Sequence, residues 1–153
     1  MTIGKEENFT LYGDDGQKQA SGILLDGKLH KNYQVFHEGA PQASMHYRHG
    51  LLDGESIVLY APHEVAARMN YSSGKLHGLS EYYARDGQLV RRAPYVMGRL
   101  HGIVQDFYPN GKLREQTSFK LGVQDGECIR YAMDGRVIER ILYQAGKPKP
   151  KAV

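Results

Sequence analysis

Apolar side chains recur along the chain at a constant interval. One series, called the ladder below, has members twelve residues apart with a single step of eleven: Tyr12, Leu24, Phe36, Tyr47, Leu59, Tyr71, Tyr83, Tyr95, Phe107, Phe119, Tyr131 and Tyr143. Glycines recur at intervals of 23 or 24 residues: Gly27, Gly50, Gly74, Gly98, Gly122 and Gly146. A unit of about 24 residues with two ladder members and two glycine turns predicts strand–turn–strand–turn.

Polar and apolar side chains also alternate within the predicted strands. In residues 127–131 the odd-numbered side chains share one side of the strand and the even-numbered ones the other. No i, i+3, i+4 pattern persists, which argues against helix. The sequence therefore predicts an all-β fold of six tandem β-hairpin repeats, forming one elongated, twisted antiparallel meander sheet of about twelve strands. We expect the ladder to be its core, with Tyr83, Phe107 and Phe119 buried.

Turn residues separate the predicted strands. Glycine accepts a positive φ, and Asx side chains bond to the local backbone, so Asx-Gly dipeptides favour tight turns. Three such dipeptides occupy equivalent places: Asp86-Gly87, Asn110-Gly111 and Asp134-Gly135. The third repeat departs most from this pattern, because Pro62-His63 stands where the others have an Asx-Gly type of turn.

Histidines occupy one position in the other set of turns, at His30, His77 and His101. Sister repeats have Asp53 and Asp125 at this position, and both residue types offer an acceptor for a backbone N–H. Like positions lie two strands apart, about 9–10 Å, which is too far for one shared zinc ion. We therefore interpret these histidines as turn caps and expect no metal site.

Composition narrows the functional classes. The chain has 153 residues, a net charge of +3 and one cysteine, Cys128. The charge is too small to indicate nucleic-acid binding, and no nucleophile–base spacing or phosphate-binding loop accompanies the cysteine. The sequence therefore predicts neither catalysis nor a cofactor. The N-terminus lacks the apolar segment of a secretory signal, so a cytoplasmic location is expected.

The C-terminal end is basic and alternates with proline over residues 147–151. Because proline cannot donate to a β-ladder, we do not expect this segment to continue the sheet. The predicted organisation is one repeat domain at residues 1–147 and a disordered tail at residues 148–153. Three lysines contribute only about 1 kcal/mol each at an anionic surface, so membrane binding is not expected.

Two segments resemble a known repeat. Gly-Lys-Leu-His-Gly-x-x-x-x-Tyr at residues 74–83 and Phe-Tyr-Pro-Asn-Gly-Lys-Leu at residues 107–113 are similar to the variant MORN repeat, and the resemblance extends over residues 7–147. In bacteria this variant is typical of proteins assigned as antitoxins or immunity proteins of polymorphic-toxin and secretion systems. The resemblance implies a protein that neutralises a cognate toxin by direct binding and steric block. The alternative is a MORN-type scaffold that docks to membrane lipid or assembles with itself.

Several tyrosines and arginines lie an odd number of residues from the ladder. By alternation they should share the face opposite it, and tyrosine with arginine is the composition of a binding surface. The predicted partner-binding residues are Tyr33, Tyr60, Tyr82, Tyr108, Arg68, Arg92 and Arg114. The alternative interpretation is that these tyrosines pair across strands and the arginines only hydrate the face.

Overall fold

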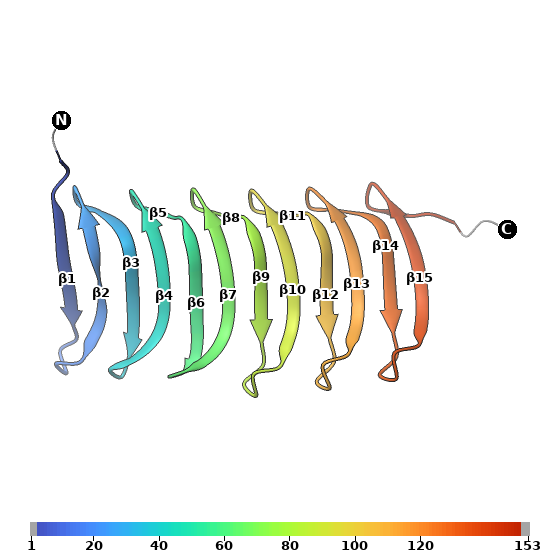
Figure 1. Cartoon of the computed structure of the whole chain (residues 1–153), viewed down its shortest axis with the longest axis horizontal. Coiled ribbons are helices and arrows are strands. Elements are labelled where there is room, and N and C mark those ends of the chain that lie inside the picture. The colour runs from blue at the N-terminus through green and yellow to red at the C-terminus, as the bar shows by residue number, and fades with distance from the viewer. Residues whose placement is uncertain (1–2, 151–153) are drawn as a thin grey trace. The chain divides into compact units, whose positions relative to one another are not determined.

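The computed structural model describes residues 3–150 of the chain, and none of these residues is helical. Contacts between Cα atoms divide the chain into an N-terminal unit, residues 1–75, and a C-terminal unit, residues 76–153. Each unit is described by itself below. The strands carry the same labels in Figure 1.

The N-terminal unit is an open antiparallel meander. Its strands are β1 (Glu6–Tyr12), β2 (Lys18–Leu25), β3 (Lys28–His37), β4 (Ala40–Arg48), β5 (Leu51–Leu52), β6 (Gly54–Ala61) and β7 (Glu64–Ser72). They pair in the order β1-β2-β3-β4-β6-β7, and the two-residue β5 pairs with β4. Sequence order thus equals spatial order, because each connection is short.

The C-terminal unit repeats the same plan. Its strands are β9 (Gly78–Tyr83), β10 (Leu89–Val96), β11 (Arg99–Leu100), β12 (Gly102–Phe107), β13 (Leu113–Lys120), β14 (Val123–Tyr131), β15 (Val137–Gln144) and β16 (Lys147–Pro148), while β8 (Lys75–Leu76) contains the boundary between the units. Apart from the two-residue strands, the described residues form twelve strands in consecutive hairpins. The predicted all-β, tandem-hairpin fold is therefore confirmed.

The Asx-Gly turns form as predicted. The backbone N–H of Gln88 donates to Oδ1 of Asp86, and that of Lys112 donates to Oδ1 of Asn110, each over 3.0 Å. Gly87 and Gly111 have φ values of 84° and 81°, a conformation that costs glycine nothing. The irregular third-repeat turn instead has Pro62 followed by His63 at φ 70°, as in a type II turn.

The other turns connect each repeat to the next. The backbone N–H of Leu121 donates to Nδ1 of His101 over 3.2 Å, and that of Ala145 donates to Oδ2 of Asp125 over the same distance. In the same way, the backbone N–H of Met97 donates to Nδ1 of His77, and that of His49 donates to Nδ1 of His30. The predicted turn caps are confirmed, and histidine and aspartate perform the same task.

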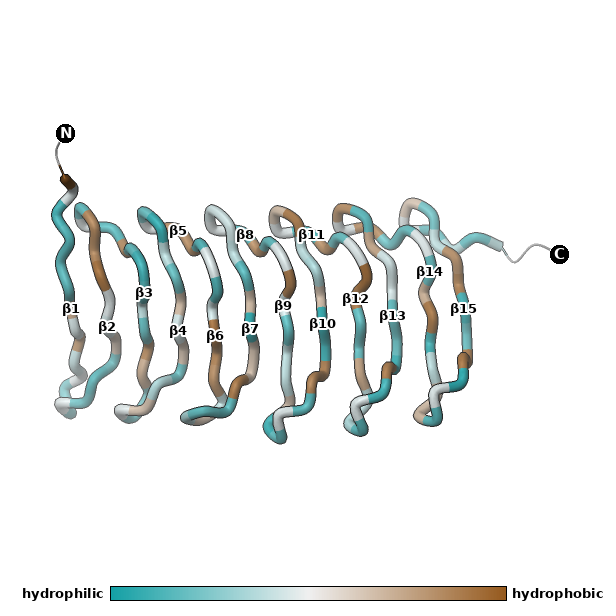
Figure 2. The backbone as a smooth tube through the Cα atoms, in the orientation of Figure 1, coloured by the Kyte–Doolittle hydropathy of each residue, from teal (hydrophilic) through white to brown (hydrophobic). Residues whose placement is uncertain are grey.

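A central row of mostly small side chains marks one face of the C-terminal sheet. This face, the small-residue face, carries the row of Ser80, Ala93, Val104, Thr117, Cys128 and Ile141, whose strand-to-strand register is direct. Ser80 and Ala93 are 0% exposed and Val104 is 2% exposed. A similar row crosses the N-terminal unit at Ala20, Val35, Ala43, Val58 and Ala67. Along the strands, hydrophobic and hydrophilic positions are interspersed (Figure 2).

The ladder is not the core, contrary to the sequence prediction. Tyr83, Phe107 and Phe119 are only half-buried. They also do not share a face: Phe119 is paired with Gly102 on the small-residue face, whereas Phe107 lies opposite Leu113 on the other face. Each unit is a single sheet layer, so no second layer covers the large rings. Nearly complete burial occurs at the centre of the strands, mostly for small side chains beneath their larger neighbours, and Ile129 is the large side chain among the described residues that reaches 3% exposure.

The C-terminal end continues the sheet further than expected. Lys147 and Pro148 form β16, paired with Gln144 and Tyr143 of β15. Pro148 lacks an N–H, but the next residue supplies one, because Lys149 donates to the carbonyl oxygen of Leu142 over 2.7 Å. The expectation that proline ends strand pairing here is therefore wrong. Residues 151–153 of the predicted tail lie outside the described residues.

Candidate partner-binding surfaces

The predicted binding residues do not lie on one face. Tyr82 is directly opposite Arg91 on the small-residue face, whereas Arg92 is opposite Glu81 on the other face. In the N-terminal unit Tyr33 lies opposite Met45 and two positions from Val35 of the small-residue row, whereas Arg68 lies opposite Ile57 on the other face. The predicted common surface of tyrosine and arginine is therefore wrong.

Two of these tyrosines contact other parts of the sheet. The ring of Tyr33 lies 6.2 Å from that of Phe9 and 6.0 Å, edge-on, from that of Tyr47. Gly22 separates Phe9 from Tyr33, and a Cβ there would stand 3.0 Å from the Tyr33 ring. Burial, and secondarily Tyr33, raises the pKa of the Tyr47 hydroxyl. The Tyr108 hydroxyl donates to the carbonyl oxygen of Tyr131 over 2.8 Å, joining two hairpins.

The predicted arginines differ in their partners. Arg68 pairs with Glu55 at 3.3 Å and Arg92 with Glu81 at 2.9 Å, so both guanidinium groups already have a carboxylate. Arg114 is exposed and has no ion pair among residues 3–150. Tyr60 is 41% exposed near the end of β6.

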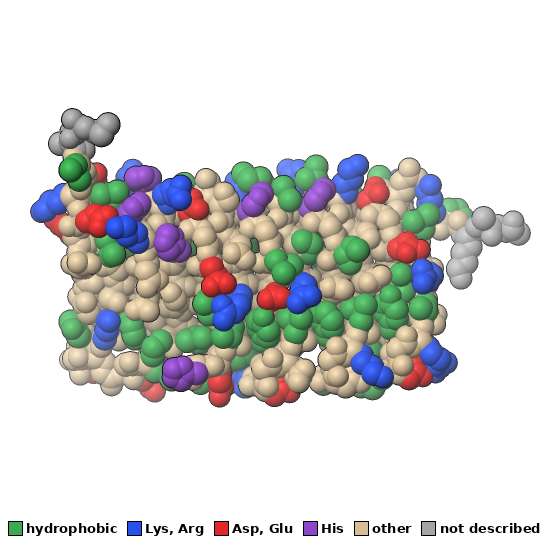
Figure 3. Space-filling model, in the orientation of Figure 1, with side chains coloured by type: hydrophobic (Ala, Val, Ile, Leu, Met, Phe, Trp, Pro, Cys, Tyr) green, Lys and Arg blue, Asp and Glu red, His purple; other side chains and the backbone are tan. Residues whose placement is uncertain are grey.

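An apolar stripe crosses the face opposite the small-residue face in the C-terminal unit. It consists of three directly opposed pairs beside the Asx-Gly turns, and we call it the turn-end stripe: Tyr83 and Leu89, Phe107 and Leu113, Tyr131 and Val137. The three hairpins are neighbours in the sheet, so the pairs lie side by side. All six side chains are partly exposed. Figure 3 shows a band of hydrophobic side chains across these strands.

Sequence reasoning missed half of the stripe. Leu89, Leu113 and Val137 are outside the ladder, yet each follows its turn glycine by two residues. This repeated Gly-x-apolar pattern was the available signal. It places an apolar residue on the returning strand opposite the ladder member that precedes the turn.

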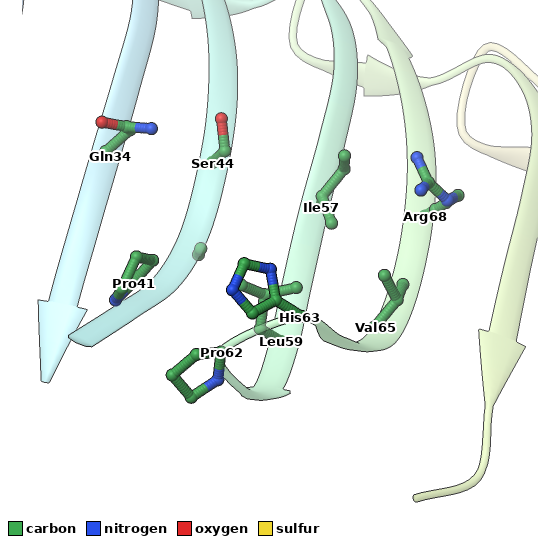
Figure 4. Close-up of a pocket in the computed structure, with 10 residues that line it drawn as sticks. Gln34, Pro41, Ser44, Ile57, Leu59, Pro62, His63, Val65 and Arg68 are labelled. Atoms are coloured by element: carbon green, nitrogen blue, oxygen red, sulfur yellow. The ribbon is translucent and has the colours of Figure 1, made fainter. Parts of the chain in front are cut away.

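A hollow of about 340 Å³ lies on the N-terminal unit beside the irregular third-repeat turn. Pro41, Leu59 and Val65 form its apolar part, and a row from four strands borders it: Gln34, Ser44, Ile57 and Arg68. Figure 4 shows the side chains of Pro62 and His63 beside Leu59. The repeat that departs most in sequence therefore forms a recess in the sheet surface.

Neither a metal cluster nor a catalytic arrangement is evident in residues 3–150. These residues contain no group of three His, Cys, Asp or Glu side chains that could hold a metal ion. The thiol of Cys128 is buried and lies 3.4 Å from Oγ1 of Thr117, which is not a base. The same residues include no helix with the length and hydrophobicity to cross a membrane.

Comparison with known proteins supports the repeat assignment. Residues 76–97 and 100–121, both in the C-terminal unit, match the family model described as the MORN repeat variant. No curated protein matches the chain. Two segments of the chain are therefore similar to the MORN repeat variant, a repeat that suggests a binding scaffold.

Proposed function

We propose that this protein is a cytoplasmic bacterial immunity protein, or antitoxin, that neutralises a cognate toxin by direct binding and steric block. The expectation that the partner is a toxin comes from the resemblance to variant MORN repeats. The observation that favours binding to a protein is the turn-end stripe. Its six apolar side chains are partly exposed on a face that no other described element of the C-terminal unit covers.

The stripe has the dimensions of a protein contact. Six strands at about 4.8 Å give a row about 24 Å long, which is too extended for one small molecule and suits a partner surface. Polar side chains border the row, including the Arg92–Glu81 pair and the half-buried Gln105 and Gln116. An apolar centre with a polar rim is the arrangement of specific protein interfaces.

The test is co-expression with the product of the gene next to this one in the native genome, the expected cognate toxin. We expect restored growth of cells that produce the toxin, and a complex of the two proteins on size exclusion. A toxin variant without activity should form the same complex, because binding does not require turnover. Restored growth without a complex would contradict direct binding, and a complex in which the toxin stays active would contradict steric block.

A second candidate function is the self-assembling scaffold, which one observation favours. Among residues 3–150, β1 pairs only with β2, and β15 pairs on its outer side only with the two-residue β16, so β1 and most of β15 each offer an unpaired edge. An exposed edge strand can pair with another chain. Light scattering during size exclusion separates the candidates: mass that rises with protein concentration supports self-assembly, and a constant monomer mass contradicts it.

A further inference from the structure

We propose that the hollow beside the irregular third-repeat turn binds an organic acid, whose apolar body lies on Leu59 and Val65 and whose carboxylate pairs with Arg68. This inference goes beyond the proposed function, because it requires neither a toxin nor the turn-end stripe. The shape of the hollow, the hydrogen bonding of Arg68 and a comparison between neighbouring repeats each support it.

The hollow has the size and composition of a small-molecule site. Its volume is about 340 Å³, and ligand pockets occupy about 300–1,000 Å³ with mostly apolar walls and a few polar groups. Pro41, Leu59 and Val65 form the apolar wall. The β6–β7 hairpin has two register shifts, whereas β9–β10, β12–β13 and β14–β15 have one each. The hollow therefore lies where the sheet departs from its regular repeat.

Arg68 supplies a cation with an unused hydrogen-bonding edge. Its Nη1 donates to the two carboxylate oxygens of Glu55 over 3.3 and 3.4 Å, and its Nε and Nη2 form no hydrogen bond within residues 3–150. Nε and Nη2 together form a fork that matches the two oxygens of a carboxylate. The Arg68 and Glu55 side chains are 40% and 48% exposed, and such exposed pairs are weak. Arg68 can therefore turn toward a ligand at little cost.

The next repeat shows which group this edge accepts. Arg92 follows Arg68 by 24 residues, its Nε donates to Oε1 of Glu81 over 3.0 Å, and its Nη2 lies 2.9 Å from the same oxygen. Glu81 lies directly opposite Arg92, and Ile57 lies directly opposite Arg68. Because isoleucine accepts no hydrogen bond, the third repeat lacks the carboxylate that the fourth repeat has. The carboxylate of a ligand would take this place.

The walls of the hollow favour an acid with an apolar body. None of the described residues that line it is acidic, whereas Arg68 and His63 carry basic groups. Figure 4 shows Ile57 and Arg68 in one row and Leu59 and Val65 in the next. Ile57 and Leu59 are two residues apart on β6, so the rows are about 7 Å apart. An acid with a chain of several carbons reaches from Arg68 to the apolar wall, and acetate does not.

The test measures the binding of octanoate to the full chain by titration calorimetry at neutral pH, with amide NMR spectra to locate it. Octanamide has the same body without the charge, octylammonium reverses the charge, and acetate lacks the body. We expect octanoate to shift the amide signals of Ile57, Leu59 and Val65. Each control should bind about tenfold or more weakly, because it lacks either the charge-assisted bond or the apolar contact. Equal binding of octanamide or octylammonium overturns the proposal.

Arg68→Ala is the decisive variant, and Arg140→Ala is its matched control. Arg140 lies opposite Ile129 and donates from Nη1 to Glu127 over 3.3 Å, so it repeats the pairing of Arg68, but it belongs to the C-terminal unit. We expect Arg68→Ala to weaken octanoate binding by about tenfold or more, and Arg140→Ala to leave it unchanged. Equal weakening by both variants, or unchanged binding in Arg68→Ala, overturns the proposal.

Ile57→Glu tests the comparison between repeats directly. It gives the third repeat the carboxylate that Glu81 gives the fourth, so the introduced group should occupy the free edge of Arg68. We expect a melting temperature close to that of the wild type, since the next repeat holds the same pair, and octanoate binding weaker by about tenfold or more. A folded Ile57→Glu variant that binds octanoate like the wild type contradicts the assigned place of the carboxylate.

A polypeptide that ends in an apolar residue presents the same chemistry as a free acid. A short peptide with a free C-terminal leucine, and the same peptide with a C-terminal amide, separate the two sources. Octanoate binding supports a free acid. Binding of the free-acid peptide alone supports a polypeptide end. Binding of neither, or octanoate shifts confined to the turn-end stripe, overturns the proposal and leaves the proposed function untouched, because the latter is tested by co-expression with the toxin.

Discussion

The small-residue row predicts that identical substitutions have different costs according to the burial of the side chain. Val104 is 2% exposed in the central row, and Val90 is 42% exposed on the neighbouring strand β10. Valine to alanine removes two methyl groups at either site and changes β-propensity equally. At Val104 the lost burial is about 1.6 kcal/mol, at about 0.8 kcal/mol per methylene, and the cavity raises the cost to about 2–2.5 kcal/mol.

At Val90 about half of that burial is present and no enclosed cavity results. Val90→Ala should therefore cost less than about 1 kcal/mol. The assay is equilibrium urea denaturation followed by far-UV circular dichroism, with tyrosine fluorescence as a second probe to test two-state behaviour. Equal costs at the two sites, or a larger cost at Val90, would refute the assignment of the core to the small-residue row.

Three further predictions concern turns and charge. His101→Ala should lower the free energy of unfolding by about 0.5–1 kcal/mol in urea denaturation. His101→Asp should change it little, because aspartate also accepts the turn N–H. An equal loss of stability in both variants would contradict the capping role of His101. Lys31 has φ 62° at a position where sister repeats have glycine. The variant Lys31→Gly should therefore be about 1 kcal/mol more stable than Lys31→Ala in the same urea denaturation. A more stable Lys31→Ala would exclude backbone strain at this position. Hydrogen bonds from Arg136, first from its backbone N–H and then from its side chain, lower the pKa of Asp134. The ionised carboxylate therefore stabilises the fold above the pKa that Asp134 has in the unfolded chain, and this stabilisation is lost as the pH falls through its pKa in the folded protein. Carboxyl-carbon NMR should show a lowered midpoint that rises in Arg136→Ala, and an unchanged midpoint would contradict the side-chain bond.

The turns could be predicted from sequence because their causes are local. An Asx side chain and the following glycine satisfy the backbone of their own turn, as at Asp86-Gly87. The exchange of histidine and aspartate at position 101 and its equivalents also indicated a shared acceptor role, and the bond at Nδ1 of His101 confirms it. The regular interval then specified how many hairpins follow one another.

The core could not be located from the ladder. A large apolar residue at every twelfth position suggests burial, but burial requires atoms on top of the side chain. In a single-layer sheet those atoms come only from neighbours on the same face. Small residues such as Ser80 and Ala93 are covered completely, and rings such as Phe107 are not.

The assignment of side chains to faces was decided by the tertiary structure. Alternation along one strand follows from the local geometry of the backbone, so sequence determines which neighbours within a strand point apart. Which residues of two strands share a face depends on strand register, and a bulge between Leu89 and Arg91 shifts the register of β9 and β10. Even-numbered Tyr82 therefore faces odd-numbered Arg91, and the parity rule that grouped Tyr82 with Arg92 fails. Register is set by hydrogen bonds between strands and by the residues that a turn or bulge absorbs, which a spacing of twelve does not reveal.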